Sequence, residues 1–228
     1  MKLAVLPMDL EDIGQVLEVD RESYSVPWPA SAYRREILHN RNARYLVLRE
    51  VSDGEESSPP PEAVQRRSIP FPFLRWPARG DDRNGQQGRV IGYAGMWMMV
   101  DEAHITTVAI RNEWRGRGLG ELLLASLVEA AAEMSARRVT LEVRVSNETA
   151  QNLYRKYGFR QEGIRPRYYS DDNEDAYIMS TDAVQDEAFR RRFDFLIGSL
   201  RTRLLEGREL EVAAPALHAP ENLPVPGD

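Results

Sequence analysis

Apolar and polar positions in the first fifty residues follow strand and helix periodicities in turn. Residues 3–8 alternate as in a strand, and Asp9 can cap a helix whose apolar residues recur at helical spacing. The break at Pro27-Trp28-Pro29 predicts that a second helix begins near residue 30 and runs to residue 40, followed by a strand at 43–49. This part of the chain is therefore predicted as strand, helix, helix, strand.

The same two periodicities continue beyond residue 88. The strand pattern is clearest at 138–145, where Val139, Leu141 and Val143 lie on one face and Glu142 on the other. The elements predicted there are strands at 89–100 and 103–110, a helix at 121–135, a strand at 138–145, a helix between Asn147 and Gly158, and strands at 160–167 and 176–181. The order β-α-α-β-β-β-α-β-α-β-β predicts a mixed α/β (α+β) fold.

Three segments lie outside this pattern. Residues 52–88 contain three consecutive prolines and clustered charges, and are predicted to be a loop or disordered insert. Residues 182–210 predict an extra amphipathic helix, and the proline-rich residues 211–228 a disordered tail. The expected organisation is one domain over residues 1–181 with these appendages.

The composition of the chain excludes some kinds of chemistry and disfavours some partners. The chain has 228 residues, 42% hydrophobic content, a net charge of −6 and no cysteine. A core can form, whereas disulfides and thiol catalysis are excluded, and general nucleic-acid binding is disfavoured. The start of the chain does not resemble a signal peptide, and no apolar run of about 18 residues predicts a membrane span. We expect a cytoplasmic protein, and His39 and His218 do not form a metal-binding pattern.

The run from Arg115 to Gly120, Arg-Gly-Arg-Gly-Leu-Gly, lies between a predicted strand and a predicted helix. Glycines let backbone N–H groups approach an anion, and the positive end of the following helix points to the same place. The run therefore predicts a diphosphate-binding loop, although many glycine-rich turns only cap helices. It lacks the Lys-Ser or Lys-Thr of a nucleoside triphosphatase loop and the glycine spacing of a dinucleotide fold.

The Arg-x-x-Gly-x-Gly spacing resembles the pyrophosphate loop of the GCN5-related N-acetyltransferases (GNAT superfamily), whose ligand is acetyl-coenzyme A. Further stretches resemble the RimI-type N-terminal protein acetyltransferases of that superfamily: Pro27-Trp28, residues 101–106, Leu141 to Asn147, residues 167–169 and residues 174–179. The resemblance spans residues 1 to about 181 without the insert. It implies the GNAT fold, a mostly antiparallel mixed sheet flanked by helices.

The resemblance also implies a coenzyme site. The backbone of Val108, Ala109 and Ile110 is expected to hold the pantetheine and acetyl end, with an N–H near Val108 as oxyanion donor. The diphosphate is expected at Arg115, Gly116, Arg117, Gly118, Leu119, Gly120 and Glu121. Asn147 would be both a helix cap and a coenzyme contact. Acetyl-coenzyme A is the implied cosubstrate, and no metal is implied.

Acetyl transfer to an amine needs a base for the amine and benefits from an acid for the departing thiolate. By the resemblance, Glu142 is the base and Tyr154 the acid. Without the resemblance, Glu142 is interpreted as an exposed strand residue that pairs with Arg144 or a neighbour, and Tyr154 as a core residue of its helix. His104 precedes the expected acetyl position by several residues, and we interpret it as structural.

The acceptor is expected to be the N-terminal α-amine of a protein, foremost the alanine of a small-subunit ribosomal protein. Tyr24, Trp28, Tyr168 and Tyr169 can line a slot for the peptide, and neighbouring acidic residues suit a basic one. A lysine side chain, a polyamine or another small amine is an alternative acceptor. A non-catalytic acyl-coenzyme A-binding adaptor is the alternative of another class. Neither nucleic acid nor membrane is an expected partner, and the sequence does not predict the oligomeric state.

Overall fold

The computed structural model describes residues 2–51, 88–206 and 211–212. Its helices and strands follow one another in the predicted order, which confirms the predicted fold class. They are β1 (Lys2–Pro7), the short 3-10 helix η1 (Leu10–Asp12), α1 (Ile13–Ser23), α2 (Ala30–His39), β2 (Ala43–Val51), β3 (Val90–Met99), β4 (Glu102–Ile110), the 3-10 helix η2 (Asn112–Trp114), α3 (Leu119–Glu133), β5 (Arg138–Arg144), α4 (Glu148–Lys156), β6 (Arg160–Arg165), β7 (Ala176–Ser180), α5 (Glu187–Glu206) and β8 (Glu211–Val212).

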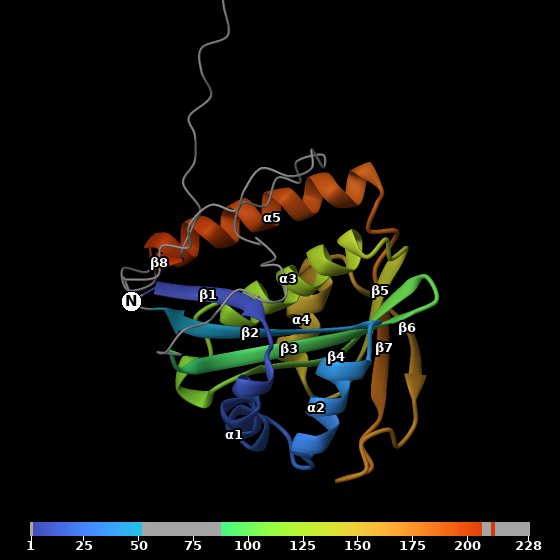
Figure 1. Cartoon of the computed structure of the whole chain (residues 1–228). Coiled ribbons are helices and arrows are strands. Elements are labelled where there is room, and N and C mark those ends of the chain that lie inside the picture. The colour runs from blue at the N-terminus through green and yellow to red at the C-terminus, as the bar shows by residue number, and fades with distance from the viewer. Residues whose placement is uncertain (1, 52–87, 207–210, 213–228) are drawn as a thin grey trace, which may run out of the picture.

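All the strands belong to one sheet with the order β6-β7-β5-β4-β3-β2-β1-β8. Neighbouring strands are antiparallel except for two pairs, β4 with β5 and β1 with the two-residue β8. This is the mostly antiparallel sheet expected of the fold. Figure 1 shows the strands running across the molecule with helices above and below them.

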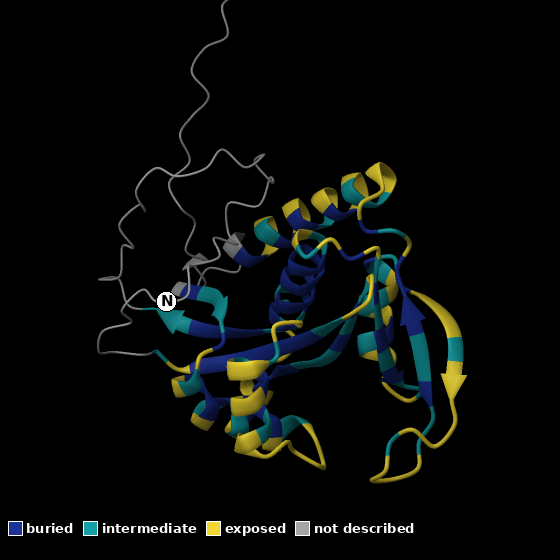
Figure 2. Ribbon diagram, turned by 45° about the vertical axis from the view of Figure 1, so that its right-hand side comes forward, coloured by how far each residue is buried: buried dark blue, intermediate teal, exposed yellow. Residues whose placement is uncertain are grey.

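Each face of the sheet has its own hydrophobic core. On one face, α1 and α2 pack over the central strands around Val16, Val19 and Tyr33. On the other face, α3 covers the sheet, α4 packs beside it, and α5 lies over α3 as an outer layer (Figure 1). Figure 2 shows that the inner faces of these helices and the central strands are buried, whereas the outer faces of α2 and α5 are exposed. Because Val139, Leu141 and Val143 of β5 belong to the α3 core, Glu142 points to the opposite face of the sheet.

The two parallel strands β4 and β5 pair over only part of their length. Their ladder joins residues 102–105 to residues 138–141. Beyond Ile105, β4 continues to Ile110 paired only with β3, and β5 continues to Arg144 paired only with β7. The backbone groups of β4 that face away from β3 are therefore left without a neighbouring strand over residues 106–110. We refer to the stretch over which β4 and β5 are no longer paired with each other as the wedge.

Some element boundaries differ from the predicted ones. The turn between β3 and β4 lies at Val100 and Asp101, one residue earlier than predicted, and Val100 adopts φ = 62°. Residues Glu211 and Val212 form β8, so the predicted disordered tail is wrong at these two positions. Nearly all of the predicted insert (52–87) and the rest of the predicted tail (213–228) lie outside the described residues.

Candidate active site

The loop between β4 and α3 presents a row of unpaired donors. In the part of the chain that the structure describes, no backbone N–H from Gly116 to Glu121 has a hydrogen-bond acceptor. Gly116 and Gly118 adopt φ values of 77° and 80°, which side-chain-bearing residues rarely adopt. These N–H groups and the positive end of α3 have the chemistry that suits the diphosphate of a coenzyme.

The side chains of this loop hold it in place. The Arg115 guanidinium donates to the carbonyl of Ile110 at 3.1 Å and to the Ser23 hydroxyl at 3.2 Å. Arg117 stacks on the Trp114 ring at 4.8 Å and donates to the Glu113 carbonyl. Of the remaining predicted residues, Leu119 is buried in the α3 core, and the side chain of Glu121 is nearly buried among cationic groups of α4 and α5. The loop thus offers mainly its backbone to an anion.

We expect Gly118→Ala to weaken coenzyme binding by about five- to thirtyfold, because a left-handed φ costs an ordinary residue about 1–2 kcal/mol. The new Cβ would meet Leu200 and Leu204 at 3.5 and 3.6 Å, which are ordinary contacts, so the fold should persist. Calorimetric titration with coenzyme A measures the change. Gly14→Ala is the control, since a Cβ at this position in α1 meets no atom within 4 Å. Equal affinities for wild type and Gly118→Ala would exclude the loop from the site.

The wedge lies next to this loop. Val108, Ala109 and Ile110 line its β4 side and pair with Ala94, Tyr93 and Gly92 of β3 on their other side. A ligand whose diphosphate sits at the loop can therefore extend along the open edge of β4 and use its free backbone groups. This placement fits the sequence expectation for the pantetheine and acetyl end.

Glu142 lies on the β5 side of the wedge and is almost completely covered. Its side chain is 5% exposed, and one carboxylate oxygen lies 2.8 Å from His104 Nε2 of β4. The other oxygen lies 3.0 Å from Nε of Arg165, which is the last residue of β6. Glu142 is therefore covered rather than exposed, and the arginine that it contacts is Arg165 of β6. His104 directly contacts the candidate base, a neighbour that the sequence did not predict.

The surroundings of Glu142 keep it ionised. Burial acts to raise the pKa of this carboxyl group, but the hydrogen bond and charge of His104, together with the charge of Arg165, outweigh it. The pKa of Glu142 therefore lies below its ordinary value of 4.5. At neutral pH the wedge contains a fixed carboxylate that accepts donors from both sides.

Tyr154 lies on α4, with its ring 5.7 Å from that of Phe159. Burial, followed by the nearby Tyr24 and Tyr169 hydroxyls, raises the pKa of Tyr154 above its ordinary value, so the phenol stays protonated at neutral pH. Among the described residues its hydroxyl has no hydrogen-bond partner. Asn147 caps the same helix, since its Oδ1 accepts from the Ala150 N–H at 3.1 Å. A protonated donor is thus available on the α4 side.

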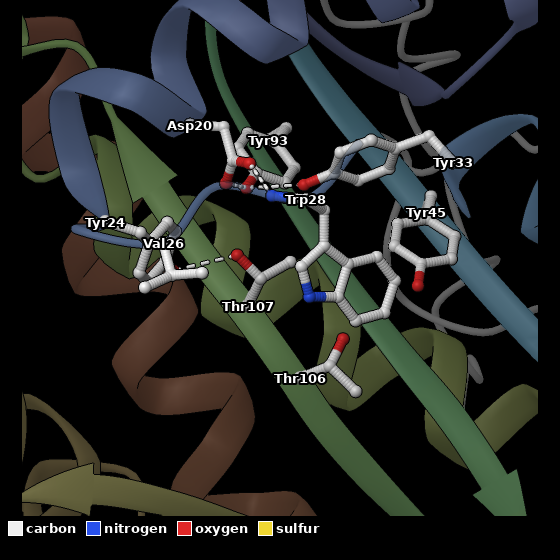
Figure 3. A pocket seen from close by; sticks show the side chains of 9 residues that line it. All are labelled: Asp20, Tyr24, Val26, Trp28, Tyr33, Tyr45, Tyr93, Thr106 and Thr107. Atoms are coloured by element: carbon white, nitrogen blue, oxygen red, sulfur yellow. Dashed lines mark hydrogen bonds between the residues drawn. The ribbon is translucent and has the colours of Figure 1, made fainter. Parts of the chain in front are cut away.

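A pocket on the α1 and α2 face adjoins the β4 edge (Figure 3). Tyr24 connects the two, since its hydroxyl is 2.8 Å from Thr107 Oγ1 and 3.3 Å from the Val108 carbonyl oxygen. The Trp28 indole stands in the middle of the pocket, 5.6 Å from the Tyr33 ring. The pocket is lined by Asp20, Tyr24, Val26, Trp28, Tyr33, Tyr45, Tyr93, Thr106 and Thr107.

Asp20 fixes the shape of this pocket and was missed by the sequence reasoning. It is 2% exposed, accepts the Trp28 N–H at 2.8 Å, and accepts the Tyr93 hydroxyl on its other oxygen. The carboxylate therefore holds the segment after α1 against β3. The sequence did contain a signal for this residue, because Asp20 stands among the apolar positions of the first predicted helix.

The segment between β6 and β7 lies near Glu142 and carries two of the predicted slot residues. The Tyr168 and Tyr169 rings meet edge to face at 5.2 Å. Arg144 of β5 organises this segment: it stacks on Tyr169 at 3.9 Å and pairs with Asp171, Asp172 and Glu174. The predicted acidic run is therefore largely engaged by one arginine, whose role the sequence reasoning also missed.

The segment also reaches toward the residues after α1. The Arg144 hydrogen bonds, followed by the Ser25 hydroxyl, lower the pKa of Asp171 to about 2. Burial, with the charge of Glu142 next, raises the pKa of Tyr168. The groups predicted for a peptide slot thus lie close enough to influence one another across the site.

Within residues 2–51, 88–206 and 211–212, no cluster of histidine and carboxylate side chains could hold a metal ion. Over the same residues, no helix is both long and apolar enough to span a membrane.

The chain is similar in sequence to a known family and to named proteins. The model of the Acetyltransferase (GNAT) family matches residues 13–159. The chain is 39% identical over 178 residues to a Bacillus subtilis protein named "Putative ribosomal protein bS18-alanine N-acetyltransferase", covering 78% of this chain and 94% of that one. It is 27% identical to the ribosomal protein bS18-alanine N-acetyltransferase of Haemophilus influenzae, covering 74% and 91% of the two chains.

Solved structures share the fold. The ribosomal-protein-S18-alanine N-acetyltransferase from Escherichia coli superposes with a TM-score of 0.57 and 21% identity, covering 79% of this chain and 94% of that one. The matched family region begins at α1 and ends just after α4, so it contains the diphosphate loop, the wedge, Glu142 and Tyr154. The chain belongs to the Acetyltransferase (GNAT) family.

Proposed function

We propose that this enzyme transfers the acetyl group of acetyl-coenzyme A to the N-terminal α-amine of a protein, foremost the alanine at the start of a ribosomal protein. The printed names of the Bacillus subtilis and Haemophilus influenzae relatives support this substrate. The coenzyme supplies an acetyl thioester. The unpaired N–H groups of residues 116–121 bind its diphosphate, the Val108 to Ile110 edge holds the acetyl end, and a free N–H of that edge stabilises the carbonyl oxygen.

The fixed, ionised Glu142 is the single observation that carries the choice of an α-amine. A carboxylate with a lowered pKa is a weak base. An α-amine has an ordinary pKa of about 8, so roughly a tenth is neutral at pH 7, against well under a thousandth of a lysine amine with a pKa of about 10.4. A weak base therefore suffices for an α-amine, whereas a lysine acceptor would need a stronger one.

Each residue then has a defined part in a direct transfer. Glu142, held by His104 and Arg165, accepts the proton of the attacking amine, directly or through one water molecule. Tyr154 gives its proton to the departing thiolate. Glu142 projects from β5 to the face opposite the α3 core, whereas Tyr154 of α4 packs against that core. His104 acts through Glu142 and is a positioning residue.

The peptide is proposed to enter between the segment after α1 and the segment between β6 and β7. The aromatic pocket of Tyr24 and Trp28 adjoins the acetyl position and would receive the side chain of the first residue. Tyr168 and Tyr169 would cover the following residues. The carboxylates on Arg144 outnumber its single positive charge, which favours a peptide with basic residues.

A peptide panel tests this proposal. Peptides that differ only at the first two residues are incubated with acetyl-coenzyme A, and release of free thiol is measured. We expect turnover with peptides that begin with alanine, and lower turnover when the first residue is charged. Turnover of spermidine or free lysine above that of every peptide would favour the small-amine alternative. Coenzyme binding without turnover of any amine would favour the adaptor.

A further inference from the structure

Helix α5 follows the region that the family model matches and packs along α3. Its buried side chains recur at helical spacing on one face: Phe193, Ile197, Leu200 and Leu204. Near its start, Arg190 pairs at 2.9 Å with Glu129, which is a buried residue of α3. Figure 1 shows α5 lying lengthwise beside α3. The helix is therefore fixed against the family domain.

The last turns of α5 reach the diphosphate loop. Leu200 Cδ1 and Leu204 Cδ2 lie 3.5 and 3.6 Å from the position that a Cβ of Gly118 would occupy. Gly118 is the left-handed residue immediately before α3 and belongs to the row of unpaired N–H groups. An element outside the matched region thus contacts the loop that is built to bind an anion.

A cationic group accompanies this contact. The carboxylate of Glu121, 9% exposed, accepts Nη2 of Arg203 at 2.8 Å on one oxygen. Its other oxygen accepts Lys156 Nζ and the Tyr157 hydroxyl. The backbone N–H of Glu121 is itself one of the six unpaired donors. Two positive charges therefore surround one negative charge directly beside the anion site, which leaves an excess of positive charge there.

We propose that Arg203, anchored by Glu121 beside the diphosphate loop, binds a phosphate group of the coenzyme, so that α5 forms part of the coenzyme site. The inference rests on the proposed use of acetyl-coenzyme A. The Arg203 side chain is 51% exposed, and within the described part of the chain one of its five N–H donors is engaged, by Glu121. A guanidinium with free donors binds phosphate oxygens in a paired geometry.

Two phosphate groups of the coenzyme share this chemistry, the diphosphate and the 3′-phosphate on the ribose. Titration calorimetry with coenzyme A and with dephospho-coenzyme A, which lacks the 3′-phosphate, distinguishes them without any acceptor peptide. We expect Arg203→Gln to weaken coenzyme A binding by about tenfold, because the variant loses a charged hydrogen-bond donor to the phosphate. A loss confined to coenzyme A would support contact with the 3′-phosphate, and an equal loss for both ligands would support contact with the diphosphate.

The control is Arg191→Gln, which removes the same charge near the start of α5, where Arg191 pairs with Glu187. It should bind both ligands like wild type. Arg203→Lys keeps the charge but loses the paired donors of the guanidinium, so it should recover only part of the lost affinity. Melting temperatures show whether each variant is folded. Glu121 keeps Lys156 and Tyr157 as partners in both Arg203 variants, so we expect them to fold.

Several results would overturn the inference. They are affinities of Arg203→Gln within twofold of wild type for both ligands, an equal loss in Arg191→Gln, or an Arg203→Lys variant as weak as Arg203→Gln. A lower melting temperature with unchanged affinity would limit Arg203 to stabilising α5 and would also overturn it. Failure of the wild-type chain to bind either ligand would instead refute the proposed function.

Discussion

Glu142→Gln should lower turnover by about 10²-fold or more with little change in coenzyme affinity. General base catalysis is typically worth 10² to 10⁴ in rate, and the amide keeps the size of the carboxylate while losing its basicity. The defect should shrink as the pH rises above about 8, where the substrate α-amine is already neutral. The measurement is a pH–rate profile for wild type and variant from about pH 6 to about pH 10, with coenzyme affinity determined by calorimetry.

The lowered pKa of Glu142 determines how its contribution to the stability of the fold changes with pH. Its ionised form stabilises the fold fully above the ordinary pKa of 4.5, and this contribution is lost as the pH falls through the lower folded-state value. Between about pH 6 and pH 10 the wild-type carboxylate stays ionised, so its own protonation does not limit the rate over this range. Glu162→Gln is the matched control, because Glu162 is also a strand glutamate paired with an arginine. Wild-type turnover in Glu142→Gln would show that this carboxylate is not the base.

Tyr154→Phe should lower turnover by about 10²-fold, the lower end of the range for general acid catalysis, because a thiolate of ordinary pKa near 8.5 can also leave without a proton donor. Alkali should not restore this loss, since the missing proton belongs to the leaving group. The phenylalanine keeps the contact with Phe159, so the fold should be retained. The assay is the same pH–rate profile, and Tyr177→Phe, another partly buried tyrosine packed on this core, is the control. Parallel responses of the Glu142 and Tyr154 variants to pH would contradict their separate roles.

Much of the fold follows from local patterns. The alternation at 138–145 placed Glu142 on the face opposite the core, and the structure has it there. Gly158 was predicted to end the helix that Asn147 caps, and it adopts φ = 87° two residues after the last residue of α4. These features depend on residues near in sequence, so spacing and residue type were sufficient to predict them.

The neighbours within the site depend on register between distant strands, which no local pattern records. His104 meets Glu142 because β4 and β5 pair in parallel over only four residues of each strand before they separate. Arg165 reaches Glu142 from β6, two strands away, through the order β6-β7-β5. The contact of α5 with Gly118 likewise joins segments about eighty residues apart in sequence. Sequence reasoning named the chemical groups but not the partners that tune them.

One measurement tests the central claim most directly. A single synthetic peptide with a free N-terminal alanine and one internal lysine is incubated with the enzyme and acetyl-coenzyme A, and fragmentation mass spectrometry locates the added acetyl group. The account predicts acetylation at the α-amine, with the lysine unmodified and no product from the same peptide blocked at its N-terminus. Acetyl on the lysine, or equal product from the blocked peptide, would contradict the assignment of this site to N-terminal acetylation.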